Sequence, residues 1–203
     1  MGTVTDTPRT TRDVLMDTAE VLFAERGVQG ATTREIVEAA RQRNASALTY
    51  HFGSRENLLL EILARRGGPV DAGRARLRAG LGEAPATSEL VWCLVEPYAA
   101  ELDSPGGRAY LRIVAQLRGR FASWRVESDE STTVSLTSIL GELEQRAPGS
   151  PEVREAHLLG MITLLTGLVA QRAHAIDRGR AVALSHQGFC AEVTDMCTSV
   201  ISC

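Results

Sequence analysis

Residues 32–55 read TTREIVEAARQRNASALTYHFGSR, and this stretch decides the fold of the chain around it. Thr32 with Glu35 three residues later is a capping box, which predicts that a helix begins here and runs to about Ala40. A polar turn and a second short helix, over residues 45–51, are expected to follow. Two short helices joined by a tight turn are typical of a helix-turn-helix DNA-binding unit.

The second of these helices is expected to face DNA. We expect Asn44 to cap it, and Leu48 and Phe52, which are four residues apart, to anchor it to the helices before it. Small outward side chains allow a helix backbone to enter the major groove, where hydroxyls reach bases and methyl groups meet thymine. The outward positions are Ala45, Ser46 and Thr49.

The charge pattern of this stretch supports the same interpretation. No carboxylate lies between Glu38 and Glu56, although Arg41 and Arg43 do. The whole chain has 203 residues and a formal net charge of −3, and all 22 of its basic residues are arginines. An acidic chain does not bind polyanions through its total charge, so contact with DNA would depend on this local acid-free face.

The rest of the chain also has helical patterns, which predicts an all-α fold. Gly67-Gly68-Pro69 is expected to break or kink a helix that starts at Arg55, and we place a domain boundary there, giving domains 1–66 and 67–203. Further helices are expected over the segments 70–81, 88–102 with a kink at Pro97, 108–117, 132–146, 152–178 and 181–201.

Several other classes of protein are disfavoured. Four cysteines without metal-ligand spacing indicate a reduced, cytoplasmic chain with no metal site. The polar start and the lack of an uninterrupted apolar run of 18 residues argue against a signal peptide and a membrane span. No catalytic constellation and no phosphate-binding glycine loop are visible, so we expect neither an enzyme nor a cofactor.

Three segments together resemble the tetracycline-repressor (TetR) family. They are LFAERG at residues 22–27, ATTREIVEAA at 31–40 and LTYHFGSRENLL at 48–59. The resemblance covers about the first third of the chain; beyond it only the length and the helical pattern agree. It implies a homodimer with three amino-terminal helices for DNA and a larger helical domain for ligand binding and dimerisation. Most such proteins look like repressors that leave a palindromic operator when a small molecule binds.

The resemblance also assigns DNA contacts to particular residues. Phosphate-contacting positions match Thr33, Tyr50, His51 and Arg55, and base-contacting positions match Arg43, Asn44, Ala45, Ser46 and Thr49. The family usually has a glycine in the turn, whereas this turn is Arg41-Gln42-Arg43-Asn44. An Asn44 in the left-handed conformation would partly replace that glycine, and the arginines at 41 and 43 would strengthen contacts to phosphates or guanine.

The effector region is less specific in sequence. Amphipathic rings suit a ligand pocket, although core packing is the more common role of any single one. The candidate pocket residues are Trp92, Tyr98, Tyr110, Phe121, Trp124, His157 and Met161. The last two predicted helices are candidates for a four-helix dimer interface. An activator with the same DNA reader, or a helical binding protein without ligand-induced release, remains an alternative function.

Overall fold

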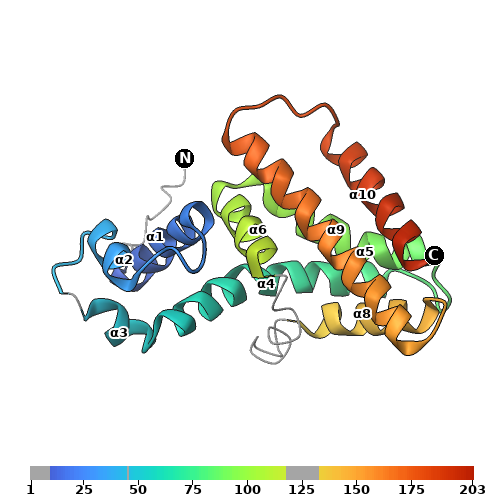
Figure 1. Ribbon diagram of the computed structural model, residues 1–203, viewed down its shortest axis with the longest axis horizontal. Helices are drawn as coiled ribbons and strands as arrows, with labels where there is room; N and C mark the ends of the chain where they lie inside the picture. The colour runs from blue at the N-terminus through green and yellow to red at the C-terminus, as the bar shows by residue number, and fades with distance from the viewer. Residues whose placement is uncertain (1–9, 45, 118–132) are drawn as a thin grey trace, which may run out of the picture.

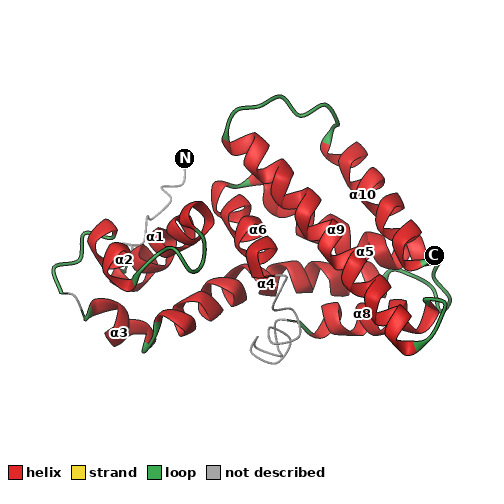
Figure 2. Ribbon diagram, viewed as in Figure 1, coloured by secondary structure: helices red, strands yellow, loops and turns green. Residues whose placement is uncertain are grey.

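The computed structural model describes residues 10–44, 46–117 and 133–203, and every regular element within them is helical (Figure 2). The all-α prediction is therefore confirmed. The elements are α1 (Thr11–Arg26), α2 (Thr33–Ala39), α3 (Ala47–Phe52), α4 (Arg55–Ala79), α5 (Thr87–Ala99), the 3-10 helix η1 (Ala100–Asp103), α6 (Pro105–Leu117), α8 (Val134–Arg146), α9 (Pro151–Asp177) and α10 (His186–Ile201).

Helices α1, α2 and α3 form a small bundle at one end of the molecule, and α4 leads from it into the larger helical part (Figure 1). The capping box predicted for α2 is present: the Thr32 side chain accepts a hydrogen bond from the Glu35 backbone, and the Glu35 carboxylate accepts one from the Thr32 backbone. Leu48 and Phe52 are buried as predicted. Local caps and an apolar pair thus establish the helix-turn-helix unit.

The start of α3 differs from the prediction. The helix begins at Ala47, with Ser46 at its N-cap, whereas the sequence predicted a start at Ala45 with Asn44 as the cap. The Asn44 side chain instead accepts a hydrogen bond from the Ser46 backbone N–H at 2.9 Å, and the Asn44 carbonyl accepts one from Ala47 at 3.0 Å. Asn44 therefore builds the turn ahead of the helix, which delays the first helical residue by two positions.

The left-handed residue of the turn also lies at a different place. Arg41 has φ of 54°, and it is the non-glycine residue with positive φ in the part of the chain that the structure describes. Its N–H bonds to the Glu38 carbonyl at 3.0 Å, and the next N–H bonds to the Val37 carbonyl at 3.0 Å, so the chain reverses directly after α2. The substitute for the family's turn glycine is therefore Arg41 and not Asn44.

The predicted break at Gly67-Gly68-Pro69 is wrong, because α4 is one helix of 25 residues with Pro69 inside it. Proline removes a backbone hydrogen bond and destabilises a helix interior. Buried side chains lie on both sides of it, including Ile62 and Leu63 before the proline and Val70 after it. Packing of both halves of α4 against neighbouring helices outweighs the tendency of Gly67-Gly68-Pro69 to break a helix.

The remaining helices form the larger part of the molecule (Figure 1). Pro97 lies within α5, which ends two residues later and passes into η1; the predicted single helix over 88–102 is thus divided in two. The last helix begins at His186, five positions after the predicted start. Phe121 and Trp124, two candidate pocket residues, lie outside the described residues, as does Ala45.

Helix α9 has the length and hydropathy of a membrane span. Its 27 residues include an 18-residue window of mean hydropathy 1.3, of which 33% is buried. The sequence does not predict a membrane span here, because polar residues interrupt the apolar run. Length and hydropathy do not by themselves separate a span from a core or interface helix. The helix packs against α6, α8 and α10.

Candidate DNA interface and effector region

The outer face of α3 and its preceding turn exposes most of the predicted DNA contacts. Tyr50 is 85% exposed, although it is a large aromatic residue. An aromatic side chain left in solvent on a short helix gains nothing from the protein core, which favours a contact with a partner. The other exposed positions are Arg41, Arg43, Asn44, Ser46 and Thr49.

The other residues predicted to contact DNA are more buried. Thr33 and His51 are half-buried, and the His51 ring contacts the Tyr50 ring edge-on, with centroids 5.0 Å apart. The Arg55 side chain is 18% exposed. Its Nε donates to the Ala31 carbonyl at 2.9 Å and its guanidinium lies over the Phe23 ring at 5.2 Å. Arg55 therefore joins the start of α4 to α1 and to the segment before α2.

A buried carboxylate fixes α1 against α4. Glu20 of α1 is 2% exposed. It accepts hydrogen bonds from Arg65 Nη2 at 2.9 Å and from Arg66 Nε and Nη2 at 3.1 and 3.2 Å, and Arg65 Nη1 also binds Asp17 at 2.8 Å. The hydrogen bond to Glu20 raises the pKa of Arg66, with burial acting against it. Two arginines on one buried carboxylate lock the orientation of α4 relative to the helix-turn-helix bundle.

Helix α6 holds the other end of α1. The Gln116 side chain accepts from the Val28 N–H at 2.8 Å and donates to the Phe23 carbonyl at 3.2 Å. Arg112 donates to the Ala24 carbonyl at 2.7 Å and also pairs with Asp177 at the end of α9 at 3.1 Å. The last carbonyls of α1 are thus satisfied by side chains from the larger part of the protein. A displacement of α6 would therefore move the end of α1, and α9 is linked to the same point through Arg112.

Comparison with known proteins agrees with this geometry. Residues 15–62 match the family described as "Bacterial regulatory proteins, tetR family". The amino-terminal region of the chain thus matches the tetR family. The match spans α1, α2, α3 and the first part of α4, which are the elements that form and orient the exposed face.

Two repressors of known sequence resemble part of the chain. The chain is 39% identical over 57 residues to the HTH-type transcriptional repressor AcnR of Corynebacterium glutamicum, and 46% identical over 52 residues to the HTH-type transcriptional repressor KstR2 of Rhodococcus jostii. These segments make up 28% and 26% of this chain, and the chain spans only 30% and 25% of the length of those relatives. The similarity in sequence to each relative thus covers only about a quarter of this chain.

Solved structures extend the likeness of fold to the full length. A tetR family transcription regulator from Shewanella sp. PV-4 has a TM-score of 0.62 at 15% identity, covering 94% of this chain and 96% of that one. The AmtR protein of Mycobacterium smegmatis has a TM-score of 0.56 at 21% identity, covering 98% and 89%. At such identities the fold is shared, and the ligand of one protein says nothing about the ligand of another.

In the larger helical part of the protein, the structure brings two of the candidate pocket residues together. Tyr98 of α5 and Tyr110 of α6 are buried, and their rings meet edge-on with centroids 6.2 Å apart. His157 and Met161 lie on α9, where Met161 is fully buried and His157 is half-buried. Trp92 is half-buried on α5. Among the described residues, no ring contact or hydrogen bond joins these three to the tyrosine pair.

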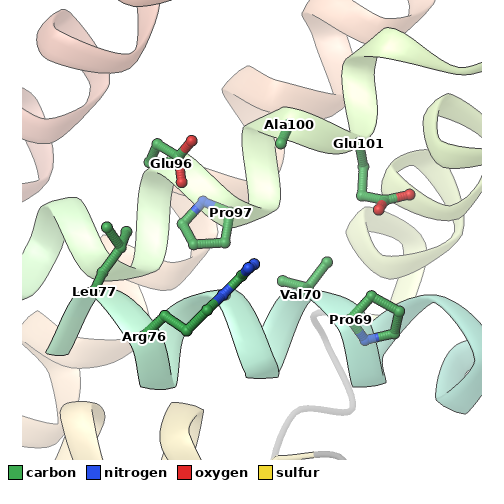
Figure 3. A pocket seen from close by; sticks show the side chains of 9 residues that line it. Pro69, Val70, Arg76, Leu77, Glu96, Pro97, Ala100 and Glu101 are labelled. Carbon is green, nitrogen blue, oxygen red and sulfur yellow. The ribbon is translucent and has the colours of Figure 1, made fainter. Parts of the chain in front are cut away.

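A groove of about 260 Å³ lies between α4 and the α5–η1 segment (Figure 3). Of the candidate pocket residues that the structure describes, none lines it. Its walls carry apolar and charged groups together, and its lining comprises Pro69, Val70, Gly73, Arg76, Leu77, Glu96, Pro97, Ala100 and Glu101. The pocket assignments made from the sequence therefore stay predictions.

Sequence reasoning missed a buried charged residue beside the tyrosine pair. Arg74 of α4 is 7% exposed. The available signal was its spacing from Asp71, three residues earlier on a helix that was expected to be interrupted here. For metal ions, no group of three or more histidine, cysteine, aspartate or glutamate side chains suited to binding one occurs within residues 10–44, 46–117 and 133–203.

Proposed function

We propose that this protein is a ligand-responsive transcriptional regulator that binds a palindromic operator as a homodimer and acts as a repressor released by a small molecule. The observation that carries the proposal is the exposed, acid-free face formed by α3 and its turn within the region that matches the tetR family. Arginines, hydroxyls and an exposed tyrosine at this face are suited to phosphates and base edges. The proposal divides the chain into a DNA-binding domain, residues 1–66, and an effector and dimerisation domain, residues 67–203.

A dimer face is supported by α9 and α10, which lie side by side at the edge of the molecule away from α3 (Figure 1). Large apolar side chains remain in solvent on these two helices: Val153 is 42% exposed, Leu159 47% and Met196 40%. Two such helices from each protomer would pack into a four-helix interface, and the apolar, partly exposed α9 would then be covered. The two α3 helices would be held at a fixed separation.

Release would follow from a change in that separation. Consecutive half-sites in the major groove lie about 34–36 Å apart, so a shift of a few ångströms prevents both α3 helices from docking together. Because α4 is one helix of 25 residues, about 37 Å long, it transmits displacement of the effector domain to the α3–α4 junction as a rigid lever. A ligand acts only through a difference in its affinity for the two arrangements.

The first experiment selects DNA sites from a random duplex pool with the full chain. The proposal expects an enriched palindrome, and a dimer by analytical ultracentrifugation at micromolar concentration. Thr49→Ala is expected to relax the sequence preference, and Tyr50→Ala to weaken binding to every duplex, because the two side chains are assigned to bases and phosphates.

Both substitutions lie on the surface, so neither is expected to change the free energy of unfolding by more than about 0.5 kcal/mol. Failure to enrich a palindrome would contradict the function. Unchanged affinities of both variants would contradict the placement of α3 against DNA. Small molecules that dissociate the selected duplex then test the released-repressor mechanism separately.

A further inference from the structure

The effector domain contains one buried cation with incomplete compensation. The Arg74 side chain lies within the α4 surface that packs against other helices, and its Nε has no hydrogen-bond partner among the described residues. Its ion-pair partner is Asp71 Oδ1, and the distance of 3.7 Å from Nη1 is too long for a good hydrogen bond. Burial lowers the pKa of the Arg74 guanidinium, which is the direction expected when a charge loses water.

The Asp71 carboxylate is hydrogen-bonded to the start of α8. Its Oδ2 accepts from the Ser135 N–H at 2.9 Å and its Oδ1 accepts from the Leu136 N–H at 2.8 Å, so the carboxylate caps the start of α8. These amides and the positive end of the α8 dipole compensate the aspartate charge. Among the described residues, Arg74 Nε is therefore left without a hydrogen-bond partner, and the carboxylate paired with Nη1 is 3.7 Å away.

The two buried tyrosines lie on the same side of α4. The Tyr110 hydroxyl is 3.6 Å from the point that a Cβ on Gly67 would occupy, and Gly67 precedes Arg74 by seven residues, which is two helical turns. The Tyr98 hydroxyl reaches only the Leu111 carbonyl, at 3.5 Å, among the described residues. Burial raises the pKa of Tyr110 to about 12, with the Arg74 charge acting against it, and burial also raises the pKa of Tyr98, so both hydroxyls stay protonated donors.

We propose that Arg74, Tyr98 and Tyr110 form the recognition site for the carboxylate of an apolar organic acid, which is the effector. The planar guanidinium binds a carboxylate through two parallel hydrogen bonds, and the tyrosine hydroxyls donate to the remaining lone pairs. A carboxylate carries one negative charge, which suits one buried guanidinium whose ion-pair partner among the described residues lies as far away as 3.7 Å. Leu111, whose carbonyl accepts from the Tyr98 hydroxyl, is fully buried, so we expect the body of the acid to be apolar too.

This inference rests on the proposed function and names its ligand class. It also places the ligand on the transmitting helix, because Arg74 and the α3–α4 junction belong to the same α4. The acid would become the close partner of Arg74 in place of the distant Asp71 and would draw α4 toward α5 and α6. The rotation or shift of α4 would then change the separation of the two reading helices.

The test measures binding of organic acids to the full chain by isothermal titration calorimetry and by the shift in Tm. The probes are butanoate, octanoate and phenylacetate, each paired with the primary alcohol of the same carbon skeleton. We expect at least one acid to bind saturably and its alcohol to bind at least about tenfold more weakly, since a charge-assisted contact is lost. Arg74→Gln is expected to remove that difference between acid and alcohol.

Arg76→Gln is the matched control, because Arg76 lies on the same helix but is exposed in the groove of Figure 3. It should leave acid binding unchanged. If Arg74→Gln does not fold, Tyr110→Phe keeps the ring and removes only the hydroxyl, and it should weaken the acid at least about threefold. Circular dichroism and affinity for the selected operator, both without acid, verify the fold of each variant.

Binding of none of the acids, equal binding of acids and alcohols, or unchanged acid binding by Arg74→Gln or Tyr110→Phe would overturn the carboxylate site. Those results leave the proposed function standing if the chain still enriches a palindrome and a neutral molecule releases it. Conversely, an acid that binds through Arg74 without affecting operator affinity would support the site and contradict ligand-induced release. The two proposals therefore fail in different measurements.

Discussion

Replacing Arg41 with glycine should stabilise the protein and weaken its binding to DNA. Arg41 has φ of 54° in the turn between α2 and α3, a conformation that crowds the Cβ of an L-residue. Its side chain is exposed in the acid-free face and carries a positive charge toward the proposed DNA surface. One substitution is therefore expected to remove backbone strain and a proposed phosphate contact together.

The two magnitudes can be worked out separately. Relief of the left-handed strain contributes about 1–2 kcal/mol, and the greater freedom of glycine in the unfolded chain offsets about 0.4–1 kcal/mol of it. The net gain in the free energy of unfolding is about 1 kcal/mol. Loss of one phosphate contact lowers the slope of log affinity against log salt by about 0.9 per protomer, or about 2 for a dimer.

Arg41→Ala is the control, because alanine removes the same charge but keeps the Cβ. Urea unfolding should show the glycine variant about 1 kcal/mol more stable than the alanine variant. Band-shift or fluorescence-anisotropy titrations of the selected operator at several salt concentrations should show the same reduced slope for both. Equal stabilities would refute the left-handed assignment, and an unchanged salt slope would refute the phosphate contact.

Three further substitutions test the tertiary structure. Glu20→Gln should lower the free energy of unfolding in urea by about 2 kcal/mol, because two arginines lose a buried charged partner but can regain some water. As a control, Glu61→Gln changes a more exposed ion-pair residue and should lower that free energy by less than about 1 kcal/mol. Gly73→Ala should destabilise the protein by about 1–3 kcal/mol, since its new methyl group would lie 2.9 Å from Pro97 of α5. Gly141→Ala is the control: its methyl group meets nothing within 4 Å, and it should stabilise the protein by about 1 kcal/mol. Hydrogen bonds from Arg78 lower the pKa of Glu142, so the contribution of this pair to stability is present above about pH 4.5 and is lost as the pH falls. Glu142→Gln should therefore flatten the acid side of a curve of Tm against pH, and an unaltered curve would contradict the Arg78–Glu142 pair.

The helix-turn-helix unit was predictable because its determinants are close in sequence. The capping box at Thr32 and Glu35 and the apolar pair Leu48 and Phe52 are local patterns, and the structure confirms all four residues in those roles. The start of α3 was not predictable to the residue. Asn44 can cap a helix or bond to a turn, and the choice depends on how α2 ends.

The long-range features required the tertiary structure. Pro69 and its neighbouring glycines predict a helix break, yet α4 is continuous because residues before and after Pro69 are buried against other helices. Glu20 and Arg66 are 46 residues apart along the chain and meet only after α1 and α4 pack. The sequence pattern likewise marked Tyr98 and Tyr110 as candidates without indicating the buried arginine beside them.

The amino-acid sequence alone indicates an all-helical chain, a helix-turn-helix unit and a resemblance to the tetR family. Helix caps, apolar periodicity and a local charge pattern contain that information, because each depends on residues within about two turns of one another. Packing of the helices, in contrast, keeps α4 one continuous helix, joins Glu20 of α1 to two arginines of α4 and buries Arg74. Burial and charge compensation depend on residues that are distant in sequence, and their positions are set when the helices pack.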